Sequence, residues 1–432
     1  MLIRAAAFAL ALLTPAAALA QSAPPPREVA ARAAKAIEDL YFDPARAGAI
    51  AADLRKEAAA GKYDRLTDPR DLATTLTDRL RPLDGHFSVT YDPGRRQPRP
   101  GPGPAGGPPP GPIAEDEAGE ARIAYGFGRV EMLPGAIGYI NMSAFADFAS
   151  DDAPARRAAD AALTLVSGAD AVIIDLRFNG GGSPAMVGYL ASAFTPRGAE
   201  IFNTFHSREG TESEAPATWS ARPRTDVPVF ILVSGRTGSA AESFPYTLQA
   251  ARRAVVVGEP TGGAANPGGP ADLGDGFSIF ISRGAPINPI TRANWEGVGV
   301  KPDVAVPAAE ALGRAHILAL EAVLAKSPNG PFAQDSRWTL EALKAQAAAP
   351  VAYARGDYLG TYGPVSVIEE GGRMLIKRQG RPGWAVTALG GDVFFDTVTL
   401  ARRAVFERDA DGRVVALEVK GPTGPVARYR RD

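Results

Sequence analysis

The sequence has 432 residues, of which 45% are hydrophobic, 8% aromatic and 22% charged, as in globular chains of two or three domains. Its 47 basic residues against 48 acidic ones give a net charge of −1, which argues against a nucleic-acid partner. The absence of cysteine excludes disulfides, thiol catalysis and iron–sulfur clusters. Three histidines leave little for a histidine-rich metal site.

Residues 1–20 have the pattern of a secretory signal peptide. Arg4 precedes the apolar run Ala5–Leu13, and Ala18-Leu19-Ala20 before Gln21 fits a small-residue cleavage site. The alternative is a membrane anchor, but the run is short for a bilayer span and Pro15 interrupts it. We therefore expect cleavage after Ala20, a periplasmic or secreted chain, and no stable membrane insertion.

Residues 24–90 have the pattern of a small helical domain. Apolar residues recur at three- and four-residue spacing in three successive runs, and Asp43-Pro44 and Asp68-Pro69 are helix-start signals. The stretch 91–121 follows, and fifteen of the twenty residues 93–112 are proline or glycine. Such a composition cannot form a core, so we expect an exposed insert or linker.

Residues 122–325 alternate between buried strand patterns and helix patterns. Strands are expected at 137–142, 171–176, 229–233 and 255–258, with helices at 152–167, 183–194 and 239–252. Continuous Val/Ile runs between helices favour an α/β domain with mostly parallel pairing. Residues 351–432 instead show short alternating segments separated by glycine-rich turns, which predicts a small antiparallel sheet or barrel.

Two segments could carry chemistry. The first is Asp175-Leu-Arg-Phe-Asn-Gly-Gly-Gly, which follows a buried strand and ends in Gly180, Gly181 and Gly182. Exposed backbone N–H groups on consecutive glycines suit an oxyanion hole, although a tight strand-to-helix turn would explain the same glycines.

The second segment is Thr237-Gly-Ser-Ala-Ala-Glu, at the expected start of a helix. Ser239 and Glu242 form a capping-box pattern, which is a structural explanation for both residues. The same position also suits a nucleophile, because a helix N-terminus stabilises a nearby oxyanion and the small Ala240 leaves the hydroxyl accessible.

Five blocks occur in an order that resembles the C-terminal processing (tail-specific) peptidase superfamily. They are Gly138-Tyr-Ile, Ile174-Asp-Leu-Arg-Phe-Asn-Gly-Gly-Gly, Thr237-Gly-Ser-Ala-Ala-Glu, Val257-Gly-Glu-Pro-Thr-Gly-Gly and Gly299-Val-Lys-Pro-Asp. The helical region with Asp84-Gly-His86 looks like the PDZ-less branch related to interphotoreceptor retinoid-binding protein and the tricorn core protease.

The resemblance implies a Clp-protease/crotonase-like α/β core, to which the residue patterns add an N-terminal helical bundle. Residues 351–432 resemble the small lipocalin-like β domain appended to some secreted hydrolases. It implies Ser239 as nucleophile, His86 as base and Glu296 as the residue that orients His86, with an oxyanion hole from Ala240 and Gly180, Gly181 or Gly182. The lysine that serves as base in the processing-peptidase branch is replaced by Ala264 at the corresponding spacing. The tricorn branch has a serine directly before the histidine, where this chain has Gly85.

We therefore expect an exported serine-type peptidase that hydrolyses peptides or unfolded proteins, and the resemblance implies no metal or organic cofactor. Two alternatives remain open on the same fold. One is a non-catalytic carrier of a hydrophobic small molecule such as a retinoid or lipid, in which Ser239 only caps a helix. The other is an esterase that acts on small acyl groups with the same residues.

Overall fold

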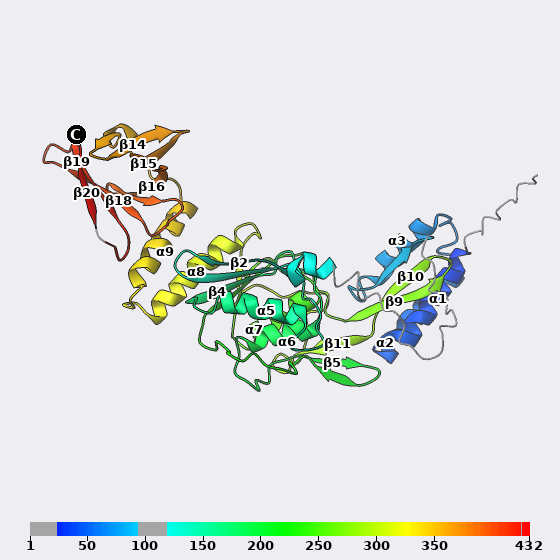
Figure 1. The fold of residues 1–432 in the computed structure, drawn as a ribbon. Coiled ribbons are helices and arrows are strands. Elements are labelled where there is room, and N and C mark those ends of the chain that lie inside the picture. Colours follow the sequence, from blue (N-terminus) through cyan, green and yellow to red (C-terminus); the bar gives the residue numbers. More distant parts are fainter. Residues whose placement is uncertain (1–23, 94–118, 425) are drawn as a thin grey trace, which may run out of the picture. The chain divides into compact units, whose positions relative to one another are not determined.

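The computed structural model describes residues 24–93, 119–424 and 426–432 (Figure 1). The expected signal peptide and most of the expected insert at 91–121 lie outside these residues. Tertiary contacts divide the chain into two compact units. Unit 1 comprises the described part of 1–80 and 87–97 together with 270–281, and unit 2 comprises 81–86, the described part of 98–269, and 282–432. No helix among the described residues is long and apolar enough to cross a membrane.

Unit 1 contains the three expected helices, α1 (Pro26–Leu40), α2 (Pro44–Ala59) and α3 (Pro69–Leu80). Each begins at proline, and their apolar faces bury residues such as Ile37, Leu54 and Leu76. Asp43 caps α2 by accepting the Ala45 N–H at 3.0 Å. The predicted helix starts at Asp43-Pro44 and Asp68-Pro69 are therefore confirmed.

Unit 1 also contains strands that the sequence did not predict. Strand β1 (Ser88–Tyr91) pairs antiparallel with β10 (Phe277–Ser282), and β9 (Gly268–Gly274) completes a three-stranded sheet. Residues 270–281, which were expected to belong to the α/β core, thus lie in the same unit as the N-terminal helices. This pairing joins segments far apart in the sequence, so no local pattern marks it.

Unit 2 is built on a six-stranded sheet in the order β12-β8-β7-β4-β3-β2. Its strands are β2 (Phe127–Leu133), β3 (Ile137–Met142), β4 (Ala171–Asp175), β7 (Val229–Val233), β8 (Val255–Gly258) and β12 (Val304–Ala305). All neighbours pair in parallel except β2 and β3. The predicted α/β class with mostly parallel pairing is confirmed.

Helices cover both faces of this sheet (Figure 1). They are α5 (Pro154–Leu165), α6 (Pro184–Ser192), α7 (Ala240–Ala250) and α8 (Ala311–Lys326). Ile174 and Ile231 face α5, α6 and α7, whereas Ile173 and Leu232 face α8. Burial on both faces explains why the strands are continuously apolar. The 3-10 helix η1 (Ala124–Gly126) precedes β2.

A second, smaller sheet in unit 2 has the order β11-β5-β6. It consists of β5 (Thr204–Ser207), β6 (Thr211–Ser213) and β11 (Gly284–Ile287), all antiparallel. The sequence analysis did not predict this sheet. Its strands have only three or four residues each, and all three residues of β6 are exposed, so no alternating pattern marks them.

The C-terminal region begins with α9 (Ala333–Ala347) and the 3-10 helix η2 (Arg355–Asp357) and continues as one eight-stranded antiparallel sheet, as predicted. The strands are β13 (Gly360–Tyr362), β14 (Val365–Glu370), β15 (Arg373–Arg378), β16 (Trp384–Gly390), β17 (Val393–Asp396), β18 (Arg403–Arg408), β19 (Val414–Lys420) and β20 (Ala427–Arg430). The Asp432 N–H donates to the Thr361 carbonyl at 3.0 Å, so the two ends of the sheet approach each other as in a near-barrel.

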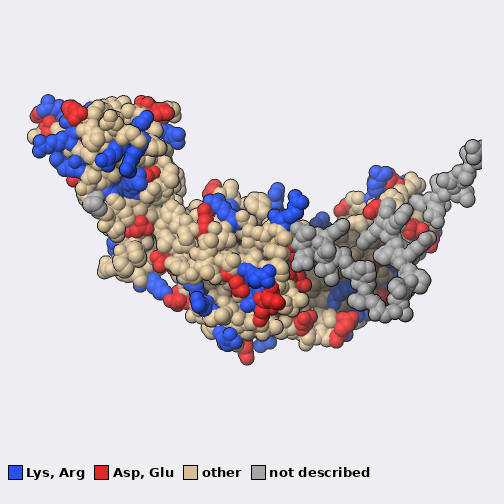
Figure 2. All heavy atoms as spheres, viewed as in Figure 1, with Lys and Arg blue, Asp and Glu red and all other residues tan. Residues whose placement is uncertain are grey.

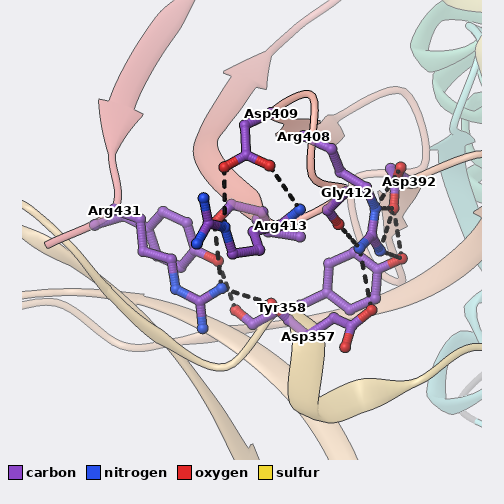
Figure 3. Close-up of polar contacts among 10 residues, drawn as sticks. Asp357, Tyr358, Asp392, Arg408, Asp409, Gly412, Arg413 and Arg431 are labelled. Carbon is purple, nitrogen blue, oxygen red and sulfur yellow. Dashed lines mark hydrogen bonds and ion pairs between the residues drawn. The ribbon is translucent and has the colours of Figure 1, made fainter.

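Arg408 fixes one end of this sheet (Figure 3). Its guanidinium donates to Asp392 at 2.9 Å, to Asp357 at 3.1 Å and to the Gly412 carbonyl at 2.7 Å, and it lies against the ring of Tyr358. One side chain thus ties η2, the β16–β17 turn and the β18–β19 turn together.

A buried polar network fastens the segment after β6 to helix α7. Both carboxylate oxygens of Glu214 accept from the Ser243 hydroxyl, at 2.6 and 2.7 Å, and one accepts from the Asn203 amide at 2.8 Å. The Asn203 amide is also within 3.1 Å of the Thr247 hydroxyl, and its carbonyl accepts from Asn288 at 2.9 Å. Ser243 and Thr247 lie on α7, so Glu214 connects this segment to that helix.

Phe394→Ala should lower the free energy of unfolding by about 3–5 kcal/mol, because Phe394 is 1% exposed and packs edge-on against Phe406. Denaturant titration of the purified chain measures this loss. Val398→Ala is the matched control in the same region, since Val398 is 80% exposed and should change stability by no more than about 0.5 kcal/mol. Equal losses in both variants would contradict the described core.

Glu214 should make stability pH-dependent. Burial raises the pKa of Glu214 from 4.5 to about 7, opposed by the Ser243 and Asn203 hydrogen bonds. The folded chain therefore holds this proton more tightly than the unfolded chain. The resulting stabilisation is complete below about pH 4.5 and is lost as the pH rises through about 7.

The glutamine in Glu214→Gln cannot ionise. This variant should therefore not show the decrease in the free energy of unfolding between low and high pH, which is on the order of 3 kcal/mol in the wild type. Denaturant titrations at about pH 5 and about pH 8 compare the two proteins. An unchanged pH dependence in Glu214→Gln would show that another group causes it.

Candidate active site

Ser239 lies in a strained turn between β7 and α7. Its backbone has φ 53° and ψ −126°, a left-handed φ that a side chain rarely adopts and that costs on the order of 1–3 kcal/mol. A serine on a sharp strand-to-helix turn is typical of a nucleophile elbow, which projects the hydroxyl away from the backbone. An ordinary helix cap has an extended backbone instead, so helix capping alone does not explain this geometry.

The glycine segment predicted from the sequence lies directly against this turn. A Cβ atom on Gly181 would lie 2.8 Å from the Cβ of Ser239, and one on Gly182 would lie 2.1 Å from the Phe145 carbonyl oxygen. Both residues also have positive φ, of 123° and 137°. Only glycine fits these two positions, and the structure therefore brings Gly181 and Ser239 together as the motifs suggested.

The backbone N–H groups beside Ser239 differ in their partners. The Gly181 N–H donates to the Asn179 side chain at 2.9 Å and is therefore occupied. Among the described residues, the N–H groups of Gly180, Gly182 and Ala240 donate to no protein acceptor. Of the four residues expected to form an oxyanion hole, these three remain available.

Glu242 binds the backbone of Ser239. Its carboxylate accepts the Ser239 N–H at 2.9 Å, which confirms this half of the predicted capping box. It also accepts from the Thr261 hydroxyl at 2.5 Å and from the N–H groups of Gly263 and Ala264 at 2.7 and 2.8 Å. Burial raises the pKa of Glu242, and these hydrogen bonds oppose the rise. The sequence suggested only the local bond to Ser239.

Glu296 binds the next two N–H groups of the same loop. Its carboxylate accepts from Ala265 at 2.7 Å and Asn266 at 3.0 Å, and its other oxygen accepts the Gly85 N–H at 2.8 Å. Loop 263–266 therefore donates four consecutive N–H groups, two to each carboxylate. Through them the backbone of Ser239 and the backbone next to His86 are connected.

His86 lies between two carboxylates. Its Nδ1 atom is 3.8 Å from Glu296 Oε2 and 3.9 Å from Asp84 Oδ1, both longer than a hydrogen bond. The structure thus brings His86 and Glu296 together, as the family resemblance implied. At Gly85, a Cβ atom would lie 3.2 Å from Glu296 Oε1, so a side chain there would point at this carboxylate.

Asp84 is a candidate that the sequence analysis did not single out. Its side chain is fully buried, and its oxygens accept from the His86 N–H and from the Asn266 side chain, each at 3.0 Å. The signal was present in Asp84-Gly-His86, two residues before the histidine. Asp84 is thus placed as well as Glu296 to orient His86.

Asp84, His86 and Glu296 also offer three potential metal-ligand atoms within 4.8 Å of one another. Every carboxylate oxygen of Asp84 and Glu296 already accepts a hydrogen bond from the protein. The protein donors offset part of the negative charge of these carboxylates, and the remaining lone pairs can accept a hydrogen bond from the His86 imidazole.

Comparisons with known proteins find a family match and several relatives for part of the chain. Residues 136–306 match the family described as Peptidase family S41. The carboxyl-terminal-processing protease of Synechocystis is 34% identical over 115 residues, 27% of this chain and 26% of that protein. The chloroplastic carboxyl-terminal-processing peptidase 1 of Arabidopsis thaliana is 27% identical over 183 residues, 42% of this chain and 36% of that protein.

Among solved structures, the photosystem II D1 C-terminal processing protease overlaps with a TM-score of 0.39 at 18% identity, covering 66% of this chain and 94% of that one. The chain spans only about a quarter to a third of the length of the two curated relatives above. The match lies in the part that carries the glycine segment, Ser239 and Glu296. Residues 136–306 are therefore similar to a peptidase S41 domain, and parts of this chain are similar to carboxyl-terminal-processing proteases.

Proposed function

We propose that this chain is an exported serine-type peptidase that cleaves peptides or unfolded proteins. Ser239 is the nucleophile, His86 the general base and acid, and Glu296 the residue that orients His86. The observation that carries the proposal is loop 263–266, which connects the backbone of Ser239 to that of Gly85 through Glu242 and Glu296. The peptidase S41 match supports the same reaction.

In this mechanism a neutral His86 imidazole takes the proton of the Ser239 hydroxyl as its oxygen attacks the scissile carbonyl carbon. The oxyanion of the tetrahedral intermediate accepts from Ala240 and from Gly180 or Gly182, whose N–H groups have no acceptor among the described residues. His86 then protonates the leaving amine, and water hydrolyses the acyl-enzyme by the reverse proton transfers.

Glu296 stabilises the imidazolium that forms at His86. The 3.8 Å separation must shorten by about 1 Å for a direct hydrogen bond. Catalytic hydrogen bonds often shorten in this way when substrate binds. Gly85 supplies no hydroxyl between the two groups, so a direct contact or a bridging water replaces any serine relay.

The proposal also covers the type of α/β core, the type of C-terminal β domain and the export of the chain. The α/β core is proposed to be Clp-protease/crotonase-like, and the near-barrel to be lipocalin-like. The signal-peptide pattern of residues 1–20 supports export to the periplasm or beyond. The hydrophobic-carrier alternative is not favoured, because a carrier has no use for a strained serine beside unoccupied N–H donors.

A fluorophosphonate probe should label the purified chain once, on Ser239, with the adduct located by peptide mass mapping. Ser239→Ala and His86→Ala should each lower labelling and peptide hydrolysis by at least about 10³-fold, because nucleophile and base act as a unit. Ser167→Ala is the control, since Ser167 is an exposed serine that bonds only its local backbone. Absence of any adduct on the folded wild type would overturn the proposed function.

Glu242→Gln tests whether Glu242 positions the nucleophile. Glutamine has one acceptor oxygen, so its NH₂ group would face N–H donors now held by the carboxylate. The Ser239 turn should shift, and kcat should fall on the order of 10²-fold with little change in KM. A variant that keeps the fold and the wild-type kcat would remove Glu242 from the mechanism. Gln249→Ala, near the other end of α7, controls for damage to the helix, because the Gln249 side chain makes an exposed hydrogen bond to the Lys301 carbonyl.

A further inference from the structure

A groove of about 1090 Å³ lies in unit 2 next to the candidate active site. Its lining includes Ser183, the residue after the three glycines, and Pro267, the residue after Asn266. Both catalytic loops therefore lead directly into it. A substrate with its scissile bond at Ser239 has this groove available for its neighbouring residues.

One wall of the groove is an edge strand. Residues Thr211, Glu212 and Ser213 form β6, which among the described residues pairs only with β5. The unpaired edge of such a strand can hydrogen-bond an extended peptide along its backbone. This wall is anchored, because Glu214 is bonded to α7 and a Cβ on Gly188 of α6 would lie 2.2 Å from the Glu214 carbonyl oxygen.

The groove carries an excess of negative charge. Its exposed charged residues are Asp147, Asp151, Glu209 and Glu212 against Arg283. Figure 2 shows acidic side chains together with basic ones over the region of α5, α6 and β5. Asp151 is paired with Arg156 and Asp147 accepts from the Ser183 hydroxyl.

Glu209 and Glu212 differ from the other two acids. Neither takes part in an ion pair with any of the described residues. Carboxylates without an ion-pair partner on a concave wall attract cations and repel anions at short range. The side chains that complement them in a peptide are those of lysine and arginine.

We propose that this groove binds the part of an extended substrate next to the scissile bond and selects lysine or arginine there, with Glu209 and Glu212 as the specificity-determining residues. The proposal rests on the proposed peptidase function. It names the substrate class as cationic peptide segments.

The test uses the full chain and an internally quenched peptide library, with cleavage sites read by mass spectrometry. The best sequence is then resynthesised with lysine, glutamine or glutamate at each flanking position. We expect kcat/KM for the lysine peptide to exceed that for the glutamine peptide by about three- to tenfold at one or more positions, with glutamate lowest. Glu209→Gln with Glu212→Gln should abolish this order, and added salt should weaken it.

The matched control is Glu200→Gln with Glu370→Gln. Both residues are exposed, neither lines the groove, and the double change alters net charge equally. It should leave the lysine preference unchanged. A wild type without preference for lysine, or a preference that survives Glu209→Gln with Glu212→Gln, would overturn the proposal while the peptidase function stands.

A binding measurement separates this result from failure of the proposed function. Fluorescence anisotropy would follow labelled lysine-rich and glutamate-rich peptides on the Ser239→Ala chain. Tighter binding of the lysine-rich peptide, lost when Glu209→Gln and Glu212→Gln are added, supports the groove even if no peptide is hydrolysed. Equal binding of both peptides overturns the groove even if hydrolysis is seen.

Discussion

The geometry of the candidate active site depends on loop 263–266, whose backbone N–H groups bind the carboxylates of both Glu242 and Glu296. Consecutive backbone N–H groups that point the same way attract an anion, and loop 263–266 offers four of them. Glu242 takes two and Glu296 takes two. Each carboxylate then has acceptor capacity for one more backbone group, which is Ser239 in one case and Gly85 in the other.

The strain at Ser239 is supported by the same contacts. A positive φ on a serine persists only where the surroundings leave no relaxed alternative. Glu242 holds its N–H, Gly181 lies against its Cβ, and Thr237 is held by a hydrogen bond of its hydroxyl to the Leu176 carbonyl at 2.8 Å. The turn is thus fixed from the helix, from the glycine segment and from the end of β4.

The sequence predicted the parts that depend on local pattern. The buried strands, the helices that cover them and the antiparallel C-terminal sheet follow from periodicity, because burial on one or two faces leaves a direct trace in the residues. The β1–β10 pairing and the β11-β5-β6 sheet leave no such trace, since each joins segments distant in the chain.

Contacts between distant segments could not be predicted within the candidate active site either. The capping box predicted that Glu242 contacts Ser239, but its bonds to Gly263 and Ala264 come from a loop beyond the next strand, and Asp84 is significant only because Asn266 lies beside it.

The position of residues 81–86, which carry His86, depends on strand pairing with a distant part of the chain. Residues 81–86 belong to unit 2, yet they are preceded by α3 and followed by β1, both of unit 1. Among the described residues, strand β1 pairs only with β10, which lies between loop 263–266 and Glu296 in the sequence. A growing chain therefore cannot anchor the histidine until nearly three hundred residues have been made. The placement of His86 beside Glu296 is thus linked to completion of the fold, so a chain truncated before β10 would lack the strand pairing that follows His86.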